Sequence, residues 1–215
     1  MKGLILKDLY TIYGYRKQYA LILVFMLVWS GLMKDTGFIS IYLLILGGML
    51  VFSSMSTDES VHFNRLALTM PISPKMLVMS KYILLIISIG CGTIIAVLLS
   101  MVCQRIFSGW TTDMEWQGML LTAVLFMAVY SISLPIIFKL GVEKARYIYV
   151  AIMLAIAMVI LGAVSLLEML GVNVEQYMIS DTNSIFLVLI LLGVSASALV
   201  ISYLCSLKVI KKKEW

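Results

Sequence analysis

Long apolar stretches separated by short polar segments dominate the hydrophobic pattern of this 215-residue chain. A helix that spans a bilayer needs about 20 mostly apolar residues, because each residue rises about 1.5 Å across a hydrocarbon core about 30 Å thick. Lipid offers the backbone no hydrogen-bond partners, so runs of this length must be helical. We predict one all-α transmembrane domain over residues 1–215, with six spans at residues 19–33, 38–55, 82–102, 118–138, 147–167 and 185–207.

Residues 2–17, before the first span, show the pattern of an amphipathic helix. Leu6, Leu9, Tyr10 and Tyr13 follow the spacing i, i+3, i+4, i+7, whereas Lys7 falls on another face. Such a helix can lie in the membrane interface. The alternative is a cytosolic extension of the first span.

The charges predict an orientation for the six spans. Hydrophobic residues make up 62% of the chain and charged residues only 13%, which argues against a soluble domain. Of the 16 Lys and Arg residues, all but Lys34 and Arg105 fall in the two termini and in the loops after spans two and four. Basic residues stay on the cytosolic side, so both termini are expected on the cytosolic side of a bacterial plasma membrane. The basic tail is expected to touch anionic lipid and not nucleic acid.

Several kinds of chemistry have no matching residues. An ion-coupled carrier generally needs ionisable groups within its spans, and none lies near the middle of any predicted span. No glycine precedes a lysine, so a phosphate-binding P-loop is excluded. His62 is the single histidine, and the three cysteines lack metal-ligand spacing and are expected to be buried. We expect no catalytic residue, metal or cofactor in this chain.

The connection between spans two and three, residues 57–74, carries the most specific local pattern. Thr57 is a plausible N-cap, with Asp58 and Glu59 in the first helical turn. An apolar stripe follows, formed by Phe63, Leu66, Ala67 and Met70. Arg65 lies on another face of the same helix. Pro71 ends this short helix, and Ser73 with Pro74 starts the next one. The stripe is covered either by the bilayer or the chain's own helices, or by a groove in a partner.

Two motifs add a family resemblance to this topology. The residues concerned are Leu6-Lys-Asp-Leu9, the acidic pair Asp58-Glu59, and Leu66-Ala-Leu-Thr-Met-Pro-Ile-Ser-Pro74 followed by Ser80-Lys-Tyr82. Together they resemble the corresponding parts of small permease subunits of bacterial type-2 ATP-binding-cassette exporters. The resemblance implies two permeases, the second a copy or a paralogue, with two ATPase subunits that bind ATP and Mg. It assigns coupling to the ATPase to Asp58, Glu59, Phe63, Arg65, Leu66, Ala67 and Met70. It also implies that residues 168–184 dip into the outer leaflet.

The cargo and the rival functions remain hypotheses at this point. Similar permeases export antimicrobial and cytolytic peptides, and 16 methionines suit an amphipathic or lipophilic cargo. One rival is the substrate-binding membrane subunit of a vitamin uptake transporter. That family would predict an Ala-x-x-x-Ala contact in the first span, but Ala20 is followed four residues later by Val24. The other rival is a non-transporting immunity or sensory protein.

Small residues in the last span permit close helix approach. They are Gly193, Ser197, Ala198, Ser202 and Ser206. They either form a dimer contact or pack this span within one subunit.

Overall fold

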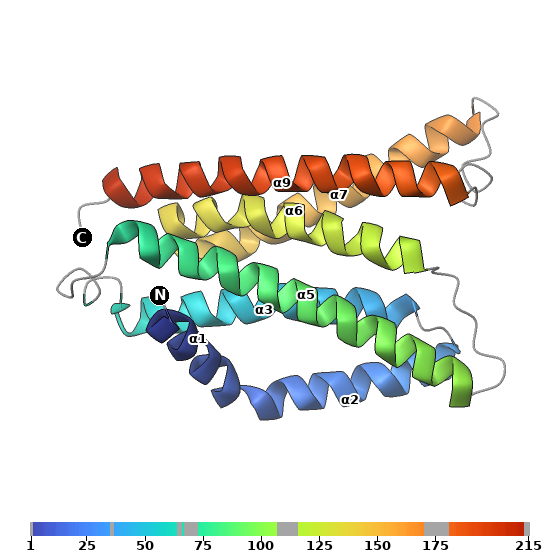
Figure 1. Ribbon diagram of the computed structural model, residues 1–215, viewed down its shortest axis with the longest axis horizontal. Coiled ribbons are helices and arrows are strands. Elements are labelled where there is room, and N and C mark those ends of the chain that lie inside the picture. Colours follow the sequence, from blue (N-terminus) through green and yellow to red (C-terminus); the bar gives the residue numbers. More distant parts are fainter. Residues whose placement is uncertain are drawn as a thin grey trace.

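A computed structural model describes residues 2–34, 37–63, 66, 73–106, 116–169 and 181–212, and the described part of the chain forms an all-helical bundle. Its helices are α1 (Lys2–Gly14), α2 (Arg16–Met33), α3 (Gly37–Ser60), α5 (Pro74–Ile106), α6 (Trp116–Leu140), α7 (Val142–Met169) and α9 (Asp181–Lys212). The long helices run in alternating directions, so the first residues of α1 and the last residues of α9 lie at the same end of the bundle (Figure 1). We call this the basic end, because Lys7, Lys81, Lys139, Lys144 and Lys208 lie there.

Four described helical segments are long and apolar enough to cross a membrane. They are Gly37–Ser60, Pro74–Cys103, Gly118–Leu140 and Leu189–Ile210. Large apolar side chains such as Leu98, Ile201 and Leu204 are exposed on their outer faces, as expected for surfaces that contact lipid and not water. The chain is therefore an all-α membrane protein. The predicted spans at 19–33 and 147–167 lie within α2 and α7.

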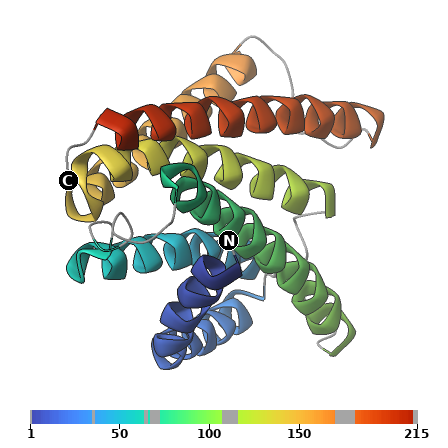
Figure 2. The same ribbon diagram turned by 60° about the vertical axis from the view of Figure 1, so that its left-hand side comes forward.

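The core lies where α3, α5 and α6 meet. Leu44, Leu84, Leu85, Tyr130 and Leu134 are almost fully buried there. α9 packs mainly on α6, and α3 packs mainly on α5 (Figure 2). A smaller cluster of Ile39, Leu43, Ala96 and Cys103 joins α3 to α5 at the opposite end from the basic end.

The first two helices meet at a bend. α1 ends at Gly14, and the chain changes direction at Tyr15 before α2 begins (Figure 1). Leu6, Tyr10 and Tyr13 on α1 are exposed. A separate helix with an uncovered apolar stripe argues against a straight extension of the first span.

The predicted start of a helix at Thr57 is wrong. α3 continues without a break to Ser60, so Asp58 and Glu59 lie in its last turn. No glycine or proline interrupts residues 49–60, and the Thr57 hydroxyl donates to the Ser53 carbonyl at 3.0 Å and so does not cap a new helix. The predicted start at Ser73 is confirmed: Ser73 Oγ accepts from the Met76 N–H at 3.4 Å, and α5 begins at Pro74.

The cysteine prediction is only partly correct. Cys103 is buried, whereas Cys91 and Cys205 are exposed on the bundle surface. In a membrane protein an apolar side chain can face lipid, so apolar character alone does not predict burial within the protein.

Candidate functional site

Four charged side chains form a cluster at the basic end, where α1, α3 and α5 meet. Lys81 Nζ lies 2.8 Å from Asp8 Oδ1 and 2.6 Å from Asp58 Oδ2. Lys7 Nζ lies 2.5 Å from Asp58 Oδ1 and 3.2 Å from Asp8 Oδ1. Asp8, Lys81 and Asp58 are 1%, 3% and 6% exposed. Two cations and two anions thus balance in a site where three side chains are buried and the Lys7 side chain is 28% exposed. We call it the four-charge cluster.

Ser54 adds hydrogen bonds to this cluster, while the buried Oδ2 of Asp8 has no hydrogen-bond partner among the described residues. The Ser54 hydroxyl donates to Asp8 Oδ1 at 2.9 Å and accepts from Lys81 Nζ at 2.8 Å. A carboxylate in the last turn of a helix is disfavoured by the helix dipole, so Asp58 needs nearby cations. Lys7 from α1 and Lys81 from α5 supply them. The cluster therefore ties the end of α3 to the helices on either side of it.

The neighbouring acid, Glu59, reaches a different helix. Its Oε2 accepts a hydrogen bond from the Val142 N–H at 2.6 Å, at the first residue of α7. An anion is favourable at a helix N-terminus, where backbone N–H groups lack partners within the helix. Gly141 permits this approach, since its φ is +87° and an added Cβ would lie 2.4 Å from Glu59 Oε1. Asp58 and Glu59 together therefore connect α3 with α1, α5 and α7.

The predicted apolar stripe divides between the chain's own contacts and its surface. Phe63 is partly buried against the core, and Lys7 Nζ lies 3.7 Å above its ring. Leu66 is 53% exposed. Arg65, Ala67 and Met70 lie outside the described residues. Among the residues named for coupling, only Leu66 is therefore seen to present an apolar side chain at the surface.

Local sequence patterns do not predict that Lys7, Asp8, Ser54 and Lys81 meet in one cluster. Leu6-Lys-Asp-Leu9 contributes to the amphipathic pattern and to the family resemblance, and Ser80-Lys-Tyr82 contributes to the resemblance. A usable signal was present, because Asp8 and Lys81 sit next to apolar segments where an unpaired charge is costly. Pairing them requires contacts between residues 73 positions apart, which local spacing cannot supply.

The small polar residues of α9 fall into two groups. The Tyr82 hydroxyl lies 2.5 Å from Ser202 Oγ and 2.9 Å from Ser206 Oγ, and Ser202 also donates to the Ser131 carbonyl. Ser202 and Ser206 are buried, so they attach α9 to α5 and α6 within the subunit. Gly193 and Ser197 are exposed, and Ala198 is half-buried. For Ser202 and Ser206 the intrasubunit alternative holds.

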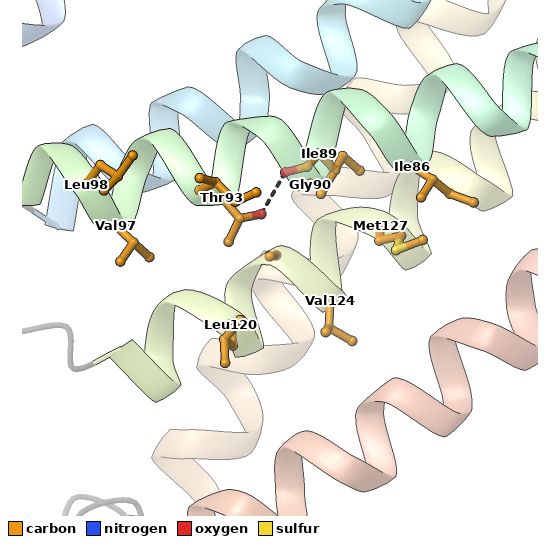
Figure 3. A pocket seen from close by; sticks show the side chains of 11 residues that line it. Ile86, Ile89, Gly90, Thr93, Val97, Leu98, Leu120, Val124 and Met127 are labelled. Atoms are coloured by element: carbon orange, nitrogen blue, oxygen red, sulfur yellow. Dashed lines mark hydrogen bonds between the residues drawn. The ribbon is translucent and has the colours of Figure 1, made fainter.

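An apolar groove of about 520 Å³ lies between α5 and α6 (Figure 3). Its lining includes Ile89, Thr93, Leu120 and Met127, and the Thr93 hydroxyl donates to the Ile89 carbonyl at 2.6 Å. We call it the α5–α6 groove. Its surface can hold an apolar group but offers no charge. Over the part of the chain described, no three His, Cys, Asp or Glu side chains gather as metal ligands.

Comparison with known proteins identifies the family. The family model described as "ABC-2 family transporter protein" matches residues 3–211. The match covers almost the whole chain, so the chain belongs to the ABC-2 transporter family and is a membrane subunit of an ATP-binding-cassette transporter. Members of this family act with ATPase subunits. Searches of curated proteins and of solved structures find no match.

Proposed function

We propose that this ABC-2 family chain is the permease subunit of an ATP-driven exporter, in which α2, α3, α5, α6, α7 and α9 form six spans. Two permeases, a second copy or a paralogue, would work with two ATPase subunits that carry the ATP and Mg, and this chain would supply no catalytic residue. Family membership supports this function over a vitamin-uptake subunit or a non-transporting immunity or sensory protein.

The four-charge cluster is the observation that carries the coupling proposal. α3 ends at Ser60, directly after Asp58 and Glu59, whose side chains contact α1, α5 and α7. A displacement of the connection between α3 and α5 by an ATPase would therefore act on four helices at once. Phe63, Arg65, Leu66, Ala67 and Met70 are the proposed contact segment.

Leu66→Asp should weaken ATPase binding at least several-fold, because it would bury an unpaired charge in the contact. Leu66→Met keeps the apolar surface and should bind normally. The measurement is the yield of ATPase that co-purifies with each variant at matched permease expression. Phe63→Asp is a poorer probe, since Phe63 also contacts Lys7. Wild-type ATPase yield with Leu66→Asp would refute the coupling assignment.

The basic end is proposed to face the cytosol. Single cysteines at Glu175 and Lys212 test this in sealed cells with a membrane-impermeant thiol reagent. The position at 175 should be labelled and the position at 212 should not, because lysine-rich segments resist transfer across the membrane. Labelling at position 212 alone would show that the orientation is the reverse of the one proposed.

A contact between two permeases is proposed on the exposed face of α9. Gly193 and Ser197 allow close approach there, with Ile190, Val194 and Ile201 exposed beside them. Ser197→Cys should form a disulfide between two chains on oxidation, and Ser206→Cys should not, because Ser206 is buried within the subunit. Equal cross-linking of both variants, or of neither, would argue against this face.

An amphipathic or lipophilic cargo, such as a peptide, is the proposed substrate. The α5–α6 groove supports it, since the lining exposes almost no polar surface. A cationic amphipathic peptide should stimulate ATP hydrolysis by the assembled transporter. A peptide of the same composition with scrambled amphipathicity serves as the control, and equal stimulation by both would exclude this cargo class.

A further inference from the structure

A second groove, of about 540 Å³, lies between the α1–α2 bend and the faces of α3 and α5. We call it the α2 groove. Tyr19 and Leu23 of α2 line one side, and Leu46, Leu84 and Cys91 line the other. It runs from Arg16 near the basic end toward the small cluster of Ile39, Leu43, Ala96 and Cys103. Leu43 belongs to both the lining and the cluster, so the groove adjoins the cluster there.

The wall of the α2 groove is apolar, and α3 and α5 approach each other closely within it. Gly47 and Gly92 line it, and an added Cβ would lie 3.1 Å from the Ser88 carbonyl oxygen and 3.3 Å from the Leu43 carbonyl oxygen, respectively. The hydroxyls of Tyr19 and Ser88 are already used, by Ser53 Oγ at 2.8 Å and by the Leu85 carbonyl at 3.0 Å. An occupant of the groove would therefore meet almost entirely hydrocarbon.

Arg16 is the charged residue in this lining. Its guanidinium lies 4.1 Å from the centre of the Tyr13 ring, which holds it beside the groove. Within the described residues, the ion pairs of Asp8 and Asp58 are made with Lys7 and Lys81, and no carboxylate pairs with Arg16. Among the described residues, the groove thus combines an apolar slot with a guanidinium that pairs with no carboxylate.

We propose that the α2 groove binds one anionic phospholipid, with an acyl chain in the slot and the phosphate on Arg16. Burial of methylene groups stabilises the chain. A guanidinium matches phosphate oxygens in charge and in bidentate geometry, whereas a peptide cargo of cationic character would be repelled. The inference rests on the membrane location of the chain and not on its transport function, so either can fail without the other.

The α5–α6 groove provides a matched control on the same helix. It is almost as large and equally apolar, but none of the residues that line it is charged. Thr93 faces this control groove (Figure 3), and Cys91 faces the α2 groove only two positions away. Two residues rise only about 3 Å along a helix, so probes at 91 and 93 report nearly the same membrane depth.

The experiment places a bimane fluorophore at one position in the full chain, with the other cysteines replaced. One variant keeps Cys91, and the other carries Cys91→Ser and Thr93→Cys. Each is reconstituted in phosphatidylcholine vesicles that contain a minor fraction of either brominated phosphatidylglycerol or brominated phosphatidylcholine. At Cys91 the anionic lipid should quench about fivefold more effectively, the ratio expected for one basic residue at an anionic surface. At position 93 the ratio should be near one.

Arg16→Gln should lower the ratio at Cys91 to that at position 93, while brominated phosphatidylcholine still quenches. Equal ratios at the two positions in the unchanged Arg16 background would overturn the proposal, because the α2 groove would then hold bulk lipid. Absence of quenching by either lipid at Cys91 would also overturn it, since a peptide or a second chain would occupy the groove. A preference that survives Arg16→Gln would refute the role of Arg16.

Discussion

Replacing Lys81 by methionine should destabilise the folded chain by about 3–5 kcal/mol, because it removes one cation from a buried ion cluster. Asp8 and Asp58 would then share Lys7 alone, with both carboxylates still buried. Methionine keeps the length of the side chain, so the loss reports charge and hydrogen bonding more than packing. The measurement is the shift in unfolding midpoint of the purified chain in detergent, followed by tryptophan fluorescence.

A second substitution distinguishes charge balance from simple damage. Asp8→Asn combined with Lys81→Met restores neutrality, so the double variant should be clearly more stable than Lys81→Met alone. Lys144→Met serves as a control, because Lys144 is exposed at the same end and should change stability by less than about 0.5 kcal/mol. A double variant that loses the sum of both single effects would show that the four charges do not act as a unit.

Length and hydrophobicity alone predict where the helices lie, because an apolar run of span length has no stable alternative to a helix in lipid. The start of α5 at Ser73-Pro74 was equally predictable, since an N-cap followed by proline is a local signal. Thr57-Asp58-Glu59 also has a pattern typical of a helix start, an N-cap followed by acidic residues, yet it lies at the end of α3. Whether such a sequence starts a helix or sits at the end of one depends on cations 51 and 23 positions away in the chain, in α1 and α5.

The candidate site could be predicted only in part for the same reason. The acidic pair was identified, but its partners Lys7, Lys81 and the Val142 N–H come from three other helices. Ser202 and Ser206 show a comparable ambiguity. Small residues four apart permit close approach of any helix. The contacts of Ser202 and Ser206 with Tyr82, and of Ser202 with the Ser131 carbonyl, show that the partner belongs to the same subunit.

Gly48→Ala should destabilise the bundle by about 3 kcal/mol or more, at the upper end of the usual cost of overpacking a core. The added Cβ would lie 1.7 Å from Cζ of Tyr130, so the ring must move as a whole. Tyr130 is 2% exposed, its ring stacks with Tyr149 at a centroid distance of 5.1 Å, and its hydroxyl donates to the Ile45 carbonyl at 3.1 Å. Each of these contacts opposes the movement.

Gly162→Ala, in α7, is the matched control, since an added Cβ there has no neighbour within 4 Å. Alanine has the higher helix propensity, so this variant should be unchanged or more stable by up to about 1 kcal/mol. Tyr130→Leu should partly rescue Gly48→Ala, because it removes the ring atoms that collide, although it has its own cost in an otherwise unchanged chain. Unfolding midpoints of the four variants in one detergent provide the comparison. If Gly48→Ala matched Gly162→Ala in stability, the close approach of α3 to the Tyr130 ring would be refuted.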